Sequence, residues 1–165
     1  TLGQRGQSSR VGIRKALAIA KGQNMPCILD INLRAPFFDD GLICESIALC
    51  SILKISDEEL HRVCQACGIE LSQSDEKVLG ELRTKFRLDL VVMTQGAEGA
   101  ILAHADGMVE QPGVPANLVD TVGAGDSFTA SMTLGLLQGK EYTEILADAC
   151  QIAAEVCSHA GAVPE

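Results

Sequence analysis

The chain has 165 residues, enough for one domain with a buried core. Hydrophobic residues make up 47% of it and aromatic residues only 3%, so the core must consist mainly of Ala, Val, Ile and Leu, as in layered α/β proteins. The formal net charge of -9, without a visible basic patch, argues against nucleic acid or an anionic membrane surface as a partner.

The seven cysteines lie in apolar segments, which indicates buried, reduced thiols in a cytoplasmic protein. Cys64 and Cys67 have the spacing of half a zinc site, but no second Cys/His pair follows at finger-like spacing, and the two lie inside a helical pattern. Neither a metal site nor a redox motif is therefore expected there. No apolar run reaches transmembrane length, and no signal-peptide pattern stands at Thr1. A start at Thr1 instead of Met suggests processing, cropping or excision from a longer chain.

Hydrophobic periodicity predicts alternating helices and strands in the first half of the chain. The expected elements are a helix, a short buried strand, a second helix and a second strand, over residues 11–20, 27–31, 41–50 and 52–55. Ser56, with Glu59 three residues later, forms a capping-box pattern that predicts a helix ending near Cys67.

The second half continues the alternation. It predicts a helix, the clearest strand, a hairpin around Asp106-Gly107 and two final helices, over residues 74–86, 90–94, 100–111, 125–137 and 143–158. Strands that alternate with helices favour a three-layer α/β/α architecture with a mostly parallel sheet. In such folds ligands bind at the carboxyl ends of the strands.

The most informative stretch reads Asp-Thr-Val-Gly-Ala-Gly-Asp-Ser-Phe-Thr-Ala, over residues 120–130. A small-residue turn that opens a helix leaves backbone N–H groups for an anion, because the first turn has no internal acceptors. A carboxylate beside a bound phosphate needs a task, such as accepting a proton from an attacking hydroxyl, and Asp126 is placed for it. Taken alone, a short glycine motif also fits an aspartate that caps a helix after a flexible turn.

The whole run resembles the signature of the ribokinase-like carbohydrate kinases, the pfkB family, which reads Asp-Thr-x-Gly-Ala-Gly-Asp. The resemblance implies that Gly123, Ala124 and Gly125 form the anion hole over the transferred phosphoryl group. It also implies that Asp126 is the catalytic base.

Asp-Ile-Asn-Leu-Arg, residues 30–34, ends the first predicted strand with polar groups that alternate with apolar ones. Arg34 could hold a phosphate or a carboxylate there, and a turn with a surface arginine fits equally well. The family carries a similar Asp-x-Asn-Leu-Arg, most often in fructokinase-like and ketodeoxygluconate-kinase-like members. The resemblance implies that Asn32 and Arg34 face the sugar-phosphate cleft.

The segment from Lys54 to Glu59 resembles the family's Lys-x-Asn-x-x-Glu. The resemblance implies that Lys54 approaches the phosphates and that Glu59 acts on Mg²⁺ through the water shell of the metal. Ser56 stands where the family usually has asparagine, so one hydrogen-bonding group is retained. A capping box at an acidic, solvated helix start also explains these residues and is compatible with the functional interpretation.

Thr94, Gly96 and Gly99 follow the clearest strand and lack the Gly-Lys-Ser/Thr ending of a P-loop. They match a Thr/Ser-x-Gly-x-x-Gly segment that lines the nucleotide in the family, although turn glycines explain the pattern as well. Cys150 takes the place of an asparagine in the family's last helix, beside the adenine pocket.

The tail resembles the family's Gly-Ala turn. That turn lies near the backbone of Asp120 and Val122 in the family and often forms a monovalent-cation site there, so the resemblance implies a K⁺ site at Asp120, Val122 and Gly161. His159 is interpreted as a surface or capping residue.

The matches cover nearly the whole chain, whereas family members are roughly twice as long. The resemblance implies that residues 1–165 form the C-terminal nucleotide-binding and catalytic portion of a ribokinase-like sugar kinase, without the N-terminal strands and the lid. The expected reaction is ATP-dependent, Mg²⁺-assisted phosphorylation of fructose or a related ketose or sugar acid, by a protein that is a homodimer at full length. We expect the isolated chain to be inactive. A nucleoside kinase of the same family and a non-catalytic nucleotide-binding module are the alternatives.

Overall fold

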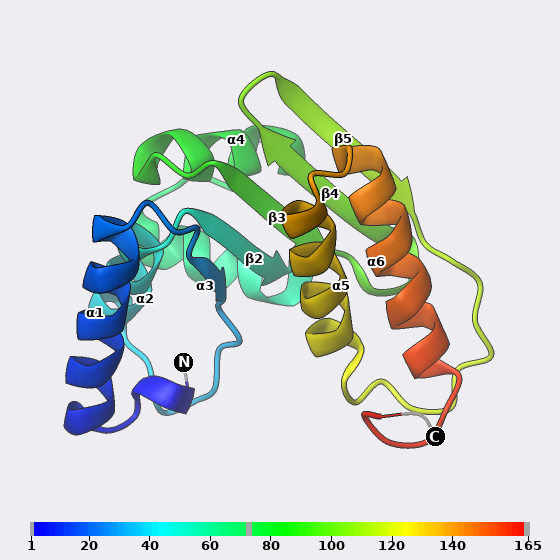
Figure 1. Ribbon diagram of the computed structural model, residues 1–165, viewed down its shortest axis with the longest axis horizontal. Helices are drawn as coiled ribbons and strands as arrows, with labels where there is room; N and C mark the ends of the chain where they lie inside the picture. Colours follow the sequence, from blue (N-terminus) through cyan, green and yellow to red (C-terminus); the bar gives the residue numbers. More distant parts are fainter. Residues whose placement is uncertain (1, 72–73, 164–165) are drawn as a thin grey trace. The chain divides into compact units, whose positions relative to one another are not determined.

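The structure is a computed structural model that describes residues 2–71 and 74–163. In these residues the chain forms six α-helices, two short 3-10 helices and five strands (Figure 1). The strands form one mixed sheet in the order β1-β2-β3-β4-β5, which follows their order in the chain. The predicted α/β class is confirmed.

The chain divides into two compact units, of which the first comprises Thr1–Met93 and Ala103–Gly107. Its elements follow the predicted alternation and are η1 (Leu2–Gln4), α1 (Gln7–Gly22), β1 (Ile28–Asp30), α2 (Asp40–Leu49), β2 (Ile52–Ser56), α3 (Asp57–Cys67), α4 (Asp75–Phe86) and most of β3 (Leu90–Thr94).

The core of the first unit surrounds strands whose residues are buried without a break. The first four residues of β2 and of β3 are all buried, as expected for strands covered on both faces. β1 runs parallel to β2 and pairs Ile28 with Ile52 and Asp30 with Lys54. This register places one acidic and one basic side chain side by side, at the last residue of β1 and in the middle of β2.

Two helices of this unit begin with side-chain caps. The Asp39 carboxylate accepts the N–H of Leu42 at 2.7 Å and caps α2. The predicted capping box of α3 is formed by Ser56 and Glu59, and the helix ends at Gly68 in the left-handed conformation.

The second unit comprises Thr94–Leu102 and Met108–Glu165. It contains η2 (Gly96–Glu98), most of β4 (Gly99–His104) and of β5 (Gly107–Pro112), α5 (Ala124–Gln138) and α6 (Tyr142–Cys157). Phe128 and Met132 of α5 are buried, as are Ile145 and Leu146 of α6. The two helices approach closely at Gly135, where a Cβ atom would lie only 2.8 Å from the Ile145 side chain.

The starts of two helices, α1 and α5, differ from the predicted ones. α1 begins at Gln7, four residues before the predicted start, because its first turn is polar and carries no hydrophobic period. α5 begins at Ala124 with Gly123 as its N-cap, so Asp126 lies in the first turn instead of opening the helix. Among the described helices, none combines the length and the apolar character that spanning a membrane requires.

Candidate active site

Most of the predicted site residues fall into two groups, one in each unit. The exceptions are Thr94, Gly96 and Gly99, at and after the end of β3, and Cys150, within α6. The first group lies where β1 and β2 end and α3 begins, and it includes Lys54 and Glu59. The second lies around the start of α5 and the end of α6, and it includes Asp126.

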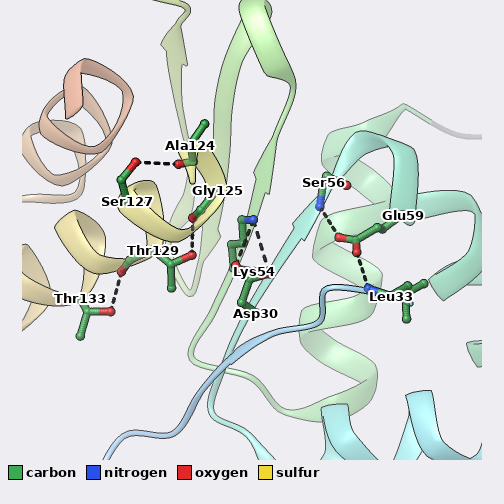
Figure 2. A network of polar contacts seen from close by, with 10 residues as sticks. All are labelled: Asp30, Leu33, Lys54, Ser56, Glu59, Ala124, Gly125, Ser127, Thr129 and Thr133. Atoms are coloured by element: carbon green, nitrogen blue, oxygen red, sulfur yellow. Dashed lines mark hydrogen bonds and ion pairs between the residues drawn. The ribbon is translucent and has the colours of Figure 1, made fainter. Parts of the chain in front are cut away.

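The buried Lys54 forms an ion pair with the partly exposed Asp30 (Figure 2). The Lys54 Nζ atom lies 3.2 Å from Asp30 Oδ2 and donates a hydrogen bond to Asp30 Oδ1 at 3.4 Å. Lys54 is only 5% exposed, so its charge needs this partner. The parallel register of the two strands therefore places the positive charge of Lys54, in the middle of β2, beside the last residue of β1.

Glu59 uses both carboxylate oxygens to hold backbone N–H groups (Figure 2). Its Oε2 accepts the N–H of Ser56 at 3.0 Å, and its Oε1 accepts the N–H of Leu33 at 2.7 Å. The first bond belongs to the capping box of α3, and the second ties the segment after β1 to that helix. Leu33 stands between Asn32 and Arg34, so Glu59 holds the backbone that carries both predicted substrate residues.

The segment that carries Asn32 and Arg34 has a constrained backbone. Asn32 adopts a positive φ of 40°, a conformation that asparagine tolerates better than most residues. Both side chains are exposed, and the Arg34 guanidinium donates to the Leu33 carbonyl at 3.3 Å. The predicted substrate residues are thus accessible and lie on a segment fixed from α3.

The start of α5 has no side-chain cap. Its N-cap is Gly123, in the left-handed conformation with φ of 87°, and no side chain accepts the N–H groups of the first turn. The hydroxyl groups of Ser127 and Thr129 donate to the carbonyls of Ala124 and Gly125, both at 2.9 Å (Figure 2). The N–H groups at the N2 and N3 positions, those of Gly125 and Asp126, have no acceptor within the helix.

The Asp126 carboxylate is exposed in this first turn. Within residues 2–71 and 74–163, no hydrogen bond or ion pair engages it. Its charge lies at the positive end of the helix dipole, an electrostatically favourable place for a negative group.

Asp120 connects the turn before α5 to the segment after α6. Its Oδ1 accepts the N–H of Val122, and its Oδ2 accepts the N–H of Gly161, each at 3.0 Å. These bonds, first that from Val122 and then that from Gly161, lower the pKa of the Asp120 carboxyl below its ordinary value. A side chain at Gly123 would meet Ala162 at 2.8 Å, so the two segments approach too closely for any residue but glycine.

The glycines after β3 have structural reasons of their own. Gly99 has φ of 113°, and a Cβ atom there would lie 2.0 Å from the carbonyl of Gln111. Gly96 has φ of 54° but open space around it. Thr94 ends β3, and the Gln95 N–H donates to the Gly99 carbonyl at 2.8 Å. The close approach of backbones thus requires glycine at position 99 whether or not a nucleotide binds.

Cys150 lies within α6 and is only 7% exposed. Burial raises the pKa of its thiol, so the thiol stays neutral. It offers little surface to a ligand, in contrast to the exposed Asn32, Arg34 and Asp126.

A family model described as pfkB family carbohydrate kinase matches residues 7–165. The chain belongs to this family. Among curated members, a fructosamine kinase of Bacillus subtilis is 34% identical over 128 residues, which cover 69% of this chain and 45% of that protein. An aminoimidazole riboside kinase of Salmonella typhimurium is 34% identical over 114 residues, which cover 66% of this chain and 34% of that protein. The chain therefore spans less than half the length of these curated pfkB relatives.

Solved structures of pfkB-type kinases have the same fold. The aminoimidazole riboside kinase of Salmonella enterica, complexed with aminoimidazole riboside and an ATP analogue, superposes with a TM-score of 0.79 at 27% identity and covers 97% of this chain and 55% of its own. The 2-dehydro-3-deoxygluconokinase of Thermotoga maritima gives a TM-score of 0.83 at 18% identity, over 96% of this chain and 52% of its own, and supports the fold alone.

Sequence patterns alone did not identify the role of Asp30. It stands in the same motif as Asn32 and Arg34, but its partner Lys54 is 24 residues away. The available signal was that each residue stands next to the last residue of a predicted strand, since the carboxyl ends of adjacent parallel strands lie at one edge. Glu59 accepts its second bond from the backbone N–H of Leu33, and a backbone N–H leaves no side-chain pattern in the sequence.

Proposed function

We propose that the polypeptide carrying this chain is an ATP-dependent phosphotransferase that phosphorylates a hydroxyl of fructose or of a related ketose or sugar acid. One observation carries the proposal: Asp126 presents an exposed carboxylate in a helix turn that begins with glycine and has no side-chain cap. A general base must reach the proton that it abstracts. The negatively charged phosphoryl group beside it needs backbone N–H donors that are open to a ligand.

In this mechanism Asp126 accepts the proton of the acceptor hydroxyl. The anion hole over the transferred phosphoryl group is assigned to Gly123, Ala124 and Gly125. The Ala124 N–H donates to the Thr121 carbonyl at 3.3 Å and would have to exchange that acceptor for a phosphoryl oxygen, whereas the N–H groups at the N2 and N3 positions have no acceptor within the helix. The dipole of α5 adds to the stabilisation of negative charge at that point. Positioning and electrostatic stabilisation are the main contributions that a protein makes to phosphoryl transfer.

The nucleotide contacts are assigned from the motifs of the pfkB family to Lys54, Ser56, Glu59, Thr94, Gly96, Gly99 and Cys150. Asp30 fixes the position of the Lys54 charge. Each Glu59 oxygen accepts one N–H and keeps a further lone pair, which suits a contact to Mg²⁺ through water. Mg²⁺, when bound, neutralises charge on the phosphate oxygens.

A monovalent cation such as K⁺ is assigned to Asp120, Val122 and Gly161. Their proximity supports this part of the proposal, because Asp120 binds both other residues directly. Carboxylate and carbonyl oxygens are suitable ligands for a hard cation.

The acceptor is assigned as a ketose because of Asn32 and Arg34, which lie exposed on the segment held by Glu59. A nucleoside or riboside is the second candidate, favoured by the 34% identity to an aminoimidazole riboside kinase. The complete protein is proposed to be a cytoplasmic homodimer. The isolated chain, which spans less than half of its curated relatives, is proposed to be inactive.

A coupled ADP-release assay on the full-length polypeptide tests the proposal. Mg-ATP is supplied with fructose, ribose, 2-keto-3-deoxygluconate or adenosine. Turnover with fructose or the sugar acid supports the assignment, and turnover with adenosine alone replaces it by the nucleoside kinase. Nucleotide binding without transfer to any acceptor contradicts the enzyme and favours a binding module.

A further inference from the structure

Two thiols of the first unit face each other between helices α2 and α3. The Sγ atoms of Cys44 and Cys67 are 3.8 Å apart, although the residues are 23 positions apart in the chain. Cys67 is the last residue of α3 and is 5% exposed, whereas Cys44 lies within α2 and is partly exposed. Neither residue belongs to the site proposed above.

A metal does not explain this arrangement. Within residues 2–71 and 74–163, no group of three or more His, Cys, Asp or Glu side chains is placed to hold an ion. The Cys44 thiol donates to the Ala66 carbonyl at 3.2 Å, a contact that keeps its sulfur beside the end of α3. The structure thus holds a pair of sulfurs instead of a metal cluster.

The pair is close to the geometry of a cystine. A disulfide has an S–S distance of about 2.05 Å, so the sulfurs must approach by about 2 Å, a movement within reach of side-chain rotation. Cys64 lies one turn earlier on α3 and is fully buried, and no sulfur contact joins it to Cys44 among the described residues. The geometry therefore selects Cys44 and Cys67 over the Cys64–Cys67 spacing that the sequence emphasises.

We propose that Cys44 and Cys67 form a reversible disulfide when the protein meets hydrogen peroxide. The sulfur of the more exposed Cys44 loses its proton and attacks the peroxide, which breaks the O–O bond and forms a sulfenic acid; the departing oxygen takes up the thiol proton and leaves as water. The Cys67 thiol then attacks the Cys44 sulfur, and a second water leaves with the Cys67 proton. In sum, two thiols lose two electrons and two protons to one peroxide, which becomes two waters.

The chemical environment of Cys67 suits this order of events. Burial, followed by the nearby Cys44, raises the pKa of the Cys67 thiol to about 12. A thiol of this kind is a poor first target for an oxidant and serves as the resolving group. The closed loop would contain Lys54, Ser56 and Glu59, so the bond would constrain the segment assigned to Mg-ATP.

The experiment treats the full-length wild-type polypeptide with hydrogen peroxide and measures intact mass and cysteine-linked peptides before and after dithiothreitol. The expected result is a mass lower by two hydrogen atoms, a peptide that joins Cys44 to Cys67, and full reversal by dithiothreitol. A link between any other pair of cysteines, or a gain of oxygen without a link, overturns the proposal.

Serine variants provide the control. Cys44→Ser and Cys67→Ser should each abolish the loss of two hydrogen atoms, and Cys64→Ser should retain it. Oxidation should also raise the thermal unfolding midpoint of the wild type by several degrees, because the bond restricts the unfolded chain. The wild-type peptide map decides the question even where a variant folds poorly. An unchanged loss of hydrogen in Cys44→Ser contradicts the proposal.

Discussion

Helices α3 and α5 both carry proposed site residues in their first turn, yet they begin in opposite ways. α3 begins with a complete capping box, and the carboxylate of its Glu59 binds two backbone N–H groups. α5 begins at Gly123 without a side-chain cap, and its Asp126 is exposed. The acid of α3 thus holds the backbone of its own unit, whereas we propose that the acid and the N–H groups of α5 serve a ligand.

The largest expected effect is the loss of turnover when the acid of α5 is replaced. Asp126→Asn preserves size and helix position but removes the proposed base, so turnover of the full-length enzyme should fall by about 10²–10⁴-fold. Nucleotide affinity and the unfolding midpoint should remain close to wild type, because within the described residues the carboxylate binds no protein group. Steady-state ADP release and calorimetric ATP binding measure the two quantities.

A matched control for this variant is Asp106→Asn, which changes an exposed aspartate in the turn between β4 and β5. It should leave turnover unchanged. An Asp126→Asn enzyme as active as this control would remove Asp126 from the mechanism.

The next effect concerns the ion pair of the first unit. Lys54→Met removes the buried charge that faces the partly exposed Asp30 and should lower the free energy of unfolding by about 2 kcal/mol. In the double variant Lys54→Met with Asp30→Leu, the loss should be smaller than the sum of the two single losses, because each single variant removes the same ion pair. Urea unfolding measures both. The Asp30→Leu single variant is measured as well. If Asp30→Leu destabilises Lys54→Met as much as it destabilises the wild type, the two residues act independently.

A smaller effect tests the role of Glu59 as a tether. Glu59→Gln retains one acceptor oxygen, so one of the N–H groups of Ser56 and Leu33 loses its partner. The free energy of unfolding should fall by about 1 kcal/mol, and the KM for the acceptor should rise because Asn32 and Arg34 lose their fixed backbone. Glu58→Gln removes the same charge from an exposed neighbour in the same turn and is the control. Equal changes in KM for both variants would show that the loss of a negative charge at the start of the helix, and not the loss of the tether, causes the effect.

The smallest expected effect is a pH dependence at Asp120. Because N–H groups lower its pKa in the folded state, its stabilising contribution is present above its ordinary value of 3.8 and is lost as the pH falls through the lowered pKa. The stability difference between wild type and Asp120→Asn should therefore shrink as the pH falls from about 5 to about 2. Urea midpoints across this range measure it. A difference that stays constant would contradict the role of the carboxylate.

The sequence predicted most of the fold, because strongly periodic segments such as residues 52–67 and 90–94 carry their own signals. It also located the capping box, whose partners lie three residues apart. The ion pair of Asp30 with Lys54 depends on strand register, and the bond from Leu33 to Glu59 depends on a backbone contact across 26 positions. Such contacts between distant segments leave no local pattern, so only the structure reveals them. Likewise the spacing of Cys64 and Cys67 concealed the pair that Cys44 forms with Cys67.

The central claim is that the first turn of α5 performs the chemistry. Its most direct test is a single-turnover measurement of phosphoryl transfer in the full-length polypeptide, with ATP fully bound to wild type and to Asp126→Asn. We expect the rate of the chemical step to fall by about 10²–10⁴-fold in the variant while the bound fraction of nucleotide stays the same. Equal single-turnover rates for both proteins would contradict it.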